Sequence, residues 1–336
     1  MTFARMALAG AVAFALSMPL AMTGAQAEQT TLRITLQLPI KSHIGQNLLD
    51  FKKDVEARSG GEISVEIYDS AQLYKDSEIP QAVASGAIEM GTASSSRFVG
   101  DVPAIDIFYV PFMFNTEELV RKATEPGSPV RAPLDEAVLE TGARVLWWQA
   151  YGGSVMLSNG GPIKSPADLK NKKVRVYGKT LGKWIEAAGG APTLISGSEQ
   201  YMAYQRGTVD IGMSGASGVK SRRLWDVMDT MTMTNNADTE FVVIINEKFW
   251  QGLSEQHREW IAEAGLKAEK QVRDAMSSIE EAAVAEAKAA GMAVYYPTDE
   301  EVATWSASVQ PVIDDYLANS GELGKKVYEG AMALRD

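Results

Sequence analysis

The sequence predicts an α/β protein made of two lobes, each a mainly parallel sheet flanked by helices. Short segments in which apolar and polar residues alternate, as in half-buried strands, are separated by segments with the helical spacing of apolar residues. This succession occurs twice along the chain, which favours two lobes over one. Residues 254–290 contain no proline and a single glycine, so we expect one long C-terminal helix there.

The first succession runs to about residue 151. Strands are expected at 32–38, 63–68 and 88–93, with helices over 45–61 and 77–87 between them. This β-α-β-α-β order indicates a parallel sheet with helices on its faces. A less regular segment with two prolines, a helix over 129–140 and a strand at 143–151 follow.

The second succession begins at "SPADLK" (165–170). Ser165 is a good N-cap, Pro166 suits the first helical position, and Asp168 lies in the first turn. The elements expected after it are a strand at 173–177, a helix over 180–189, a strand at 192–195, a helix over 197–206 and a strand at 208–214.

A continuous C-terminal helix over these 37 residues would span about 55 Å at 1.5 Å per residue, more than the diameter of one lobe. Such a helix could touch both lobes. The alternative is two ordinary helices that break near Gly265. We assign residues 28–151 and about 241–280 to lobe I, and residues 152–240 and about 281–336 to lobe II.

The first 27 residues are expected to be a signal peptide. Arg5 gives a positive start, an apolar stretch follows, and Ala25-Gln26-Ala27 fits the small-x-small pattern that precedes cleavage. Cleavage after Ala27 would leave Glu28 first. The alternative is an N-terminal membrane anchor, but no charged stop-transfer flank follows.

Composition excludes several classes of function. With 32 basic and 43 acidic residues, the chain carries a formal charge of −11, which disfavours nucleic-acid and anionic-lipid partners. The sequence has no cysteine, so thiolate catalysis and cysteine-ligated metals are excluded. Because its two histidines, His43 and His257, lie far apart and no G-x-S-x-G motif occurs, we expect no metal, no cofactor and no enzymatic activity.

Polar segments follow four predicted strands: "ASSSR" (93–97), "YGGS" (151–154), "RVYG" (175–178) and "MSGASG" (213–218). Ligands of open parallel sheets bind at the carboxyl ends of the strands, where small residues allow close approach to backbone N–H groups. Arg175 lies within the strand of "NKKVRVYGKT" (171–180), next to one of these ends. Taken alone, Arg175 fits an exposed strand arginine paired with a surface acid better than a ligand-binding residue.

The chain resembles, over nearly its whole mature length, the solute-binding subunits of tripartite ATP-independent periplasmic (TRAP) transporters, the DctP-type family. The landmarks are "YDSAQLYKDSEIPQAVASGAIEMG" (68–91), "VPFMF" (110–114), "GPIKSPADLKNKKVRVYG" (161–178) and "GAPTLISGSEQYMAYQRGTVDIG" (190–212). The resemblance implies a periplasmic binding protein whose two lobes close on a small organic acid, and we expect it to be a monomer. The small and large membrane subunits of the transporter would be its partners.

The resemblance also implies site residues. Arg175 falls on the family arginine that pairs with the ligand carboxylate, and a guanidinium fork fits a carboxylate in a bidentate way. Arg97 either approaches the ligand or forms a salt bridge that braces the cleft wall. The full candidate set is Arg175, Arg97, Ser94, Ser95, Ser214, Trp148, Tyr151 and Gln37.

Two departures from the family pattern bear on the ligand. A second arginine, common in the family after the strand at 143–151, is absent from "YGGSVMLSN", and Gly197 stands where a bulky aromatic is frequent. One cation suits one carboxylate, which favours a sugar acid, a 2-oxo acid or an aromatic monocarboxylate. A C4-dicarboxylate fits if Arg97 or Lys75 holds the second charge.

Three other functions fit parts of the sequence. A binding protein of this kind could serve a sensor kinase or chemoreceptor, or an ATP-driven importer, although the latter should lack the "KVRV" segment. An exported enzyme that acts on carboxylates is the third, and it lacks a recognisable nucleophile–base pair.

Overall fold

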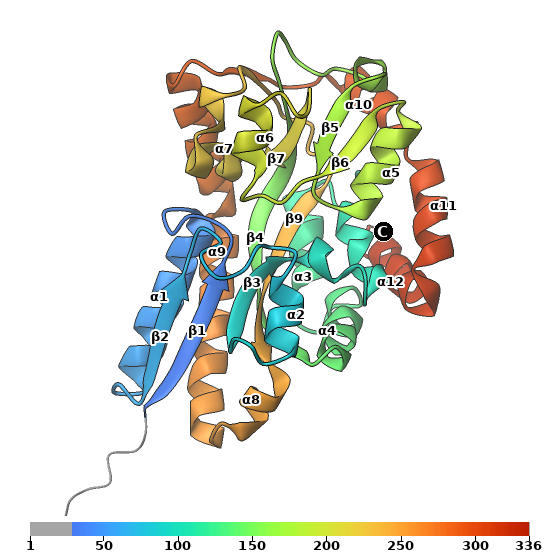
Figure 1. Ribbon diagram of the computed structural model, residues 1–336. Helices are drawn as coiled ribbons and strands as arrows, with labels where there is room; N and C mark the ends of the chain where they lie inside the picture. The colour runs from blue at the N-terminus through green and yellow to red at the C-terminus, as the bar shows by residue number, and fades with distance from the viewer. Residues whose placement is uncertain (1–28, 336) are drawn as a thin grey trace, which may run out of the picture.

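The computed structural model describes residues 29–335 and confirms the α/β prediction (Figure 1). The predicted signal peptide, residues 1–27, lies outside the described residues. The strands are β1 (Thr30–Leu36), β2 (Ile63–Tyr68), β3 (Met90–Ser94), β4 (Ala143–Ser158), β5 (Lys173–Val176), β6 (Ala191–Leu194), β7 (Gly212–Gly215), β8 (Thr230–Thr232), β9 (Asp238–Asn246) and β10 (Ala293–Tyr295).

The helices are α1 (His43–Arg58), α2 (Ile79–Ala84), α3 (Glu117–Thr124), α4 (Arg131–Glu140), α5 (Lys179–Ala187), α6 (Gln200–Gln205), α7 (Ala216–Arg222), α8 (Glu247–Gly252), α9 (Glu255–Ala289), α10 (Asp299–Ser306), α11 (Gln310–Asn319) and α12 (Gly321–Ala333). Short 3-10 helices are η1 (Ser95–Phe98), η2 (Pro103–Tyr109), η3 (Pro166–Leu169) and η4 (Leu224–Asp226). The helix start predicted at Ser165 is η3, where the Ser165 N–H donates to the Asp168 carboxylate at 2.9 Å.

The main sheet of the described chain has the strand order β10-β8-β4-β9-β3-β1-β2, with β7 also paired to β4. β1 runs parallel to β2 and β3, as the β-α-β-α-β pattern predicts. β5 and β6 form a small parallel sheet of their own. β4 and β9 run antiparallel to their neighbours in the main sheet, so the first lobe combines parallel strands with two long antiparallel ones.

β4 and β9 connect the lobes. β4 pairs with β9 from Ala143 to Gly153 and then with β7 and β8 as far as Ser158. The predicted strand end at residue 151 is therefore too early, because β4 leaves one lobe there and continues into the other. In Figure 1 the two strands run up the middle of the molecule.

α9 is a single continuous helix and not two helices broken near Gly265. Its N-cap is Ser254, whose hydroxyl accepts the His257 N–H. Gly265 stays in the helix because Trp147 packs against it: a Cβ there would lie 2.8 Å from the indole. The helix, about 52 Å long, packs against α1 in the first lobe and α7 in the second. The long helix that touches both lobes is confirmed.

The lobe boundaries stay a proposal, and one part of them changes. We expected residues 281–336 in the second lobe, but α12 packs against η2 and α4 of the first. The cause is apolar burial: Val327 and Ala331 of α12 lie in the same core, and Tyr316 of the preceding α11 donates its hydroxyl to the Ala104 carbonyl at 2.8 Å. α11 and α12 thus run back along one side of the molecule (Figure 1). No helix in the described part of the chain is both long and apolar enough to span a bilayer.

Candidate functional site

A small cavity lies where the two lobes meet. Its free volume is about 30 Å³, which is room for about two water molecules. The residues that line it come from both lobes and from the two connecting strands: Gln37, Asp76, Ser94, Arg97, Tyr151, Arg175, Tyr177, Gly197, Gln200, Ser214, Gly215, Arg222, Thr239 and Phe241. We call it the ligand cavity.

Arg175 lies in β5 with a side chain that is buried against this cavity. Its Nε and Nη2 donate to the Ile195 carbonyl at 3.0 and 2.9 Å, and Nη1 donates to the Met213 carbonyl. The guanidinium also lies over the Tyr177 ring, 5.1 Å from its centroid. Two neutral carbonyls hold the fork in place without neutralising its charge.

Within residues 29–335, Arg175 forms no ion pair with a carboxylate. Burial lowers the pKa of its guanidinium, and the positive charges of Arg97 and Arg222 add to this effect. A buried charge without a counter-ion is unfavourable. A carboxylate brought by a ligand would relieve this cost, and the arginine fork suits it.

Arg97 lines the same cavity but already has a partner. Its Nε donates to the carboxylate of Asp76, and both side chains are buried. The other oxygen of Asp76 accepts the Ser94 N–H at 3.2 Å. Of the two roles expected for Arg97, the structure therefore contains the salt bridge that braces the cleft wall.

The serines separate into two groups. Ser94 and Ser214 line the cavity, and the Ser94 hydroxyl lies 2.9 Å from the Tyr109 hydroxyl. Ser95 is fully buried and lies outside the lining, with its hydroxyl 3.1 Å from that of Tyr109. The structure thus brings two of the three predicted serines to the cavity.

Tyr151 and Gln37 line the cavity together with Arg222, which sequence reasoning missed. Arg222 Nη1 donates to the Tyr151 hydroxyl at 3.2 Å, and Nη2 lies 3.5 Å from Gln37 Oε1. The preference for a monocarboxylate assumed one available cation. That count is wrong, because the cavity lining contains Arg222 as well as Arg175.

Trp148 lies away from the cavity, in the core. It is fully buried, its ring packs 5.2 Å from that of Phe108, and its Nε1 donates to Asp135 at 2.8 Å. Lys75, the other residue considered for a second charge, pairs with Glu199 at 2.9 Å and does not line the cavity.

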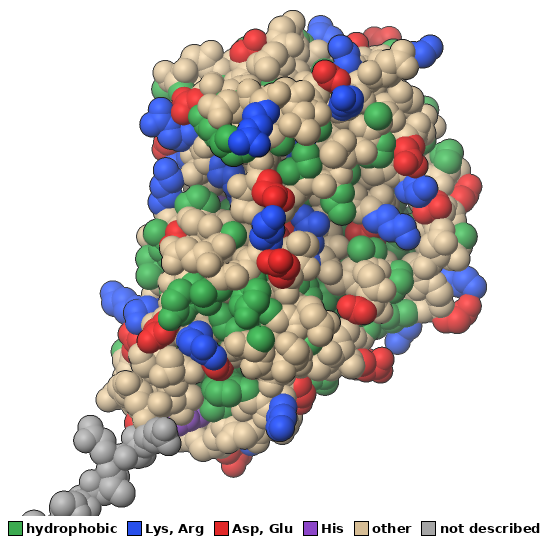
Figure 2. All heavy atoms as spheres, viewed as in Figure 1, with side chains coloured by type: hydrophobic (Ala, Val, Ile, Leu, Met, Phe, Trp, Pro, Cys, Tyr) green, Lys and Arg blue, Asp and Glu red, His purple; other side chains and the backbone are tan. Residues whose placement is uncertain are grey.

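Several contacts join the lobes around the cavity. Lys75 of the first lobe forms an ion pair with Glu199 of the second. The Ser96 hydroxyl of the first lobe donates to the Tyr177 carbonyl of the second at 2.8 Å. Asp106 accepts the N–H and hydroxyl of Thr180 at 3.0 and 2.6 Å. Figure 2 shows basic and acidic side chains close together at mid-height on this face. The lobes are therefore in contact across the cleft.

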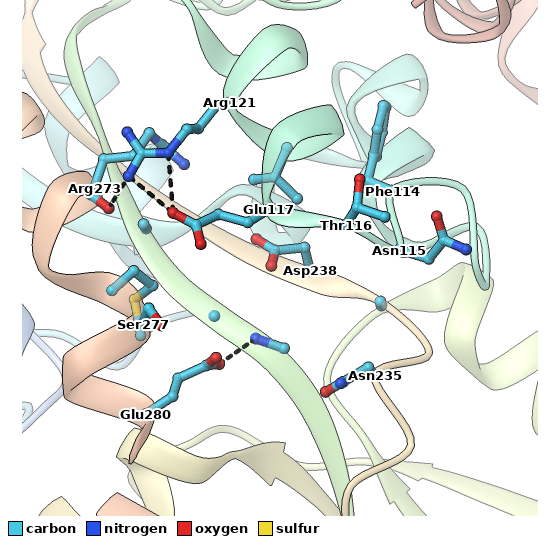
Figure 3. A pocket seen from close by; sticks show the side chains of 16 residues that line it. Phe114, Asn115, Thr116, Glu117, Arg121, Asn235, Asp238, Arg273, Ser277 and Glu280 are labelled. Carbon is cyan, nitrogen blue, oxygen red and sulfur yellow. Dashed lines mark hydrogen bonds and ion pairs between the residues drawn. The ribbon is translucent and has the colours of Figure 1, made fainter. Parts of the chain in front are cut away.

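A second cavity of about 150 Å³ lies beside the connecting strands. We call it the hinge cavity, and Figure 3 shows the side chains around it, with Glu280 reaching from α9 to the backbone of β4. Asp238 lines this cavity whereas Thr239 and Phe241 line the ligand cavity, because successive residues of a strand point to opposite faces.

Neither histidine lines the ligand cavity. His43 is half-buried beside Tyr151, and desolvation lowers the pKa of its imidazole to about 4. His257 lies 3.1 Å from Glu62 at the surface. In the described part of the chain, no group of three or more His, Asp or Glu side chains is placed to hold a metal ion.

The sequence model of one protein family matches residues 36–320; its description is bacterial extracellular solute-binding protein, family 7, DctP. A C4-dicarboxylate-binding periplasmic protein, DctP, of Rhodobacter capsulatus is 28% identical over 321 residues, or 94% of each chain. The sialic acid-binding periplasmic protein SiaP of Vibrio cholerae is 27% identical over 297 residues, 87% of this chain and 90% of its own.

Solved structures of similar proteins share the two-lobed fold. The sugar acid-binding protein DctPAm of Advenella mimigardefordensis, in complex with galactonate, superposes with a TM-score of 0.86 at 21% identity, covering 91% of this chain and 99% of its own. A TRAP periplasmic solute-binding protein of Sulfurospirillum deleyianum, with bound succinate, gives a TM-score of 0.85 at 23% identity and covers 91% and 99%.

Proposed function

The chain belongs to family 7 of the bacterial extracellular solute-binding proteins, the DctP family, and from this premise we propose that it captures a small organic acid between its lobes. The single observation that carries the proposal is Arg175, a buried guanidinium held by two backbone carbonyls and without a carboxylate partner among the described residues. A ligand carboxylate would supply the missing charge.

Capture would proceed by closure of the lobes. An acid bound to Arg175 in the second lobe gains contacts with Ser94 and Gln37 of the first, and so favours the closed conformation by its differential affinity. Closure also removes water from the cavity, which strengthens the ion pair. The proposed role is binding and release without chemical change.

The proposed place of action is the periplasm, after cleavage of the signal peptide behind Ala27. The relatives named above are described as periplasmic binding proteins, which supports this location. The small and large membrane subunits of a TRAP transporter are the proposed receivers of the acid, and the binding protein would act as a monomer.

A thermal-shift screen tests the proposal. The purified protein is heated with a library of sugar acids, 2-oxo acids, aromatic acids and dicarboxylates, beside Arg175→Ala, Arg175→Lys and the control Lys173→Ala. Lys173 lies in the same strand with an exposed side chain. We expect at least one acid to raise the melting temperature of the wild type and of Lys173→Ala.

Arg175→Ala should lose about 2–5 kcal/mol of binding free energy, which is about 30- to 5,000-fold in affinity. Arg175→Lys should bind with intermediate strength, because it keeps the charge but not the fork. If an acid raised the melting temperatures of the wild type and of Arg175→Ala equally, Arg175 would not be a ligand-binding residue. No shift with any acid would overturn the proposed function itself.

A further inference from the structure

Arg222 is the last residue of α7, and its side chain turns into the ligand cavity. Its two Nη atoms meet neutral oxygens only, the Tyr151 hydroxyl at 3.2 Å and Gln37 Oε1 at 3.5 Å. Both contacts are long for hydrogen bonds of a charged donor. They orient the guanidinium without neutralising it.

The basic residues nearest to Arg222 in the sequence, Lys220 in α7 and Arg223 just after it, form ion pairs, and within the described chain Arg222 does not. Lys220 forms an ion pair with Glu286 at 2.6 Å, and Arg223 forms one with Asp226 at 3.1 Å, both near the surface. Within residues 29–335, Arg222 has no such carboxylate. Of Lys220, Arg222 and Arg223, only Arg222 points into the cavity, and it is also the one that lacks a counter-charge in the described chain.

Two glycines leave room for this guanidinium. A Cβ at position 197 would lie 2.9 Å from Arg222 Nη2 and 2.7 Å from Gln37 Oε1, and a Cβ at position 218 would lie 2.2 Å from the Tyr151 hydroxyl. Neither glycine has a positive φ, so the backbone does not demand glycine there. The absence of side chains at both positions instead gives Arg222 its access to the cavity.

The charges around the cavity do not balance. Among the described residues that line it, three are arginines and one is a carboxylate, Asp76, which is taken by Arg97. Arg175 and Arg222 remain, so the described lining carries two positive charges without partners. A ligand with one carboxylate would neutralise half of this charge, and a ligand with two anionic groups would neutralise all of it.

We propose that Arg222, oriented by Gln37 and Tyr151, is a second ligand-binding residue that holds a second anionic group of the acid bound to Arg175. This inference rests on the proposed function and makes it more specific, because it makes Arg222 the residue that selects acids with two ionised groups over acids with one.

Isothermal titration calorimetry of matched pairs of acids tests it. The pairs are succinate with succinamate, 2-oxoglutarate with 2-oxopentanoate, and galactarate with galactonate; the second member of each lacks the second carboxylate. We expect at least one diacid to bind about 10- to 100-fold more tightly than its partner. Arg222→Gln should lower the affinity for that diacid to nearly the affinity for the monoacid, while the monoacid changes less than about threefold.

Two further variants separate charge from fold. Arg223→Gln is the matched control on the adjacent residue and should keep the preference, and Arg222→Lys should keep part of it because the charge remains. Circular dichroism and the melting temperature of each unliganded variant report on folding. If Arg222→Gln does not fold, Arg222→Lys and the wild-type preference still decide the question.

The outcomes are distinct. If the wild type binds both members of every pair equally, or if Arg222→Gln keeps the diacid preference, Arg222 has no such role while the proposed function stands. If no acid of any pair, nor any acid of the thermal-shift library, binds the wild type, the proposed function fails and this inference fails with it.

Discussion

The ligand cavity and the hinge cavity lie on either side of β4 and β9, and their charges are unbalanced in opposite ways. In the ligand cavity, Arg175 and Arg222 have no carboxylate partner among the described residues. In the hinge cavity both arginines are paired, Arg273 with Glu240 and Arg121 with Glu117. There, as far as the described residues go, the groups without a cation are carboxylates, those of Asp238 and Glu280.

The excess positive charge of the ligand cavity and the excess negative charge of the hinge cavity can be neutralised in different ways. A cation such as Arg175 stays protonated at any physiological pH, so only an anion from outside can neutralise it. A buried carboxylate can take up a proton instead. Burial raises the pKa of Glu280, and burial together with the charge of Glu240 raises the pKa of Asp238 well above its ordinary value. We therefore expect pH to act on the hinge cavity, whereas the proposed function makes organic acids the partners of the ligand cavity.

Removal of Arg273 should have the largest effect on the hinge. Its two Nη atoms donate to both oxygens of Glu240 at 2.8 and 2.9 Å, and Glu240 is fully buried. Arg273→Met leaves that carboxylate unpaired, which should destabilise the protein by about 3–5 kcal/mol. Urea unfolding of the variant and the wild type measures the difference.

Arg121→Met is the control for this experiment, because its side chain is more exposed and its ion pairs lie at the surface. It should change the free energy of unfolding by less than about 1 kcal/mol. The double variant Arg273→Met, Glu240→Gln should recover part of the loss. Equal effects of Arg273→Met and Arg121→Met would show that the hinge cavity does not depend on the buried pair.

Asp238→Asn should stabilise the protein, and more so at higher pH. The raised pKa means that the folded protein holds the Asp238 proton more tightly than the unfolded chain does. Stability is therefore lost as pH rises from the ordinary carboxyl range towards the folded pKa. Asparagine keeps the shape without the charge.

The gain from Asp238→Asn should be near zero at pH 4 and about 1 kcal/mol at pH 8, since Asp238 is half-buried and an unpartnered buried polar group costs about 1–3 kcal/mol. Melting curves across this pH range measure it. Glu322→Gln, on a side chain that is 90% exposed, is the control and should leave the pH profile unchanged. A pH-independent gain for Asp238→Asn would contradict the assignment.

The structure places Arg175 against the cavity as the sequence predicts. Arg222, by contrast, could be assigned to the cavity only from the fold. Arg175 lies in a short alternating strand within a specific motif. Arg222 stands in "KSRRLW", where three basic residues look alike, and it reaches Gln37, which is 185 positions away in the sequence. No local pattern tells which of these side chains enters a cavity built from such distant segments.

Strand geometry bears on the other differences. β4 has register shifts between Val145 and Trp147 and between Ala150 and Gly152. Each shift changes which side chains face which side, and a sequence does not show where a strand bulges. Trp148 lies three positions before Tyr151, so alternation alone points the two side chains to opposite faces, Trp148 to the core and Tyr151 to the cavity. The strand β9 is not predicted either, because its continuous apolar run "FVVII" lacks the alternation that marks a half-buried strand.

The smallest expected effect comes from the pair at the surface of the cleft, Lys75 and Glu199. Both side chains are about half exposed, at 53% and 50%. Although this pair joins the lobes, such exposed pairs contribute about 0–1 kcal/mol. Lys75→Ala should therefore lower the affinity for the best acid of the screen by less than about fivefold. The buried arginines, and not this pair, would then provide the free energy of closure on an acid.

Calorimetry of Lys75→Ala at low and at high salt measures this contribution, because salt screens an exposed pair much more than a buried one. Lys122→Ala is the control: Lys122 pairs with Glu118 at 2.8 Å with similar exposure but within one helix, so its loss should leave the affinity unchanged. If Lys75→Ala lowered the affinity more than tenfold, the exposed pair at the cleft surface, and not the unpaired arginines inside the cleft, would provide most of the free energy of closure. In that case the charge imbalance of the ligand cavity would determine which acid binds without determining how firmly the lobes close.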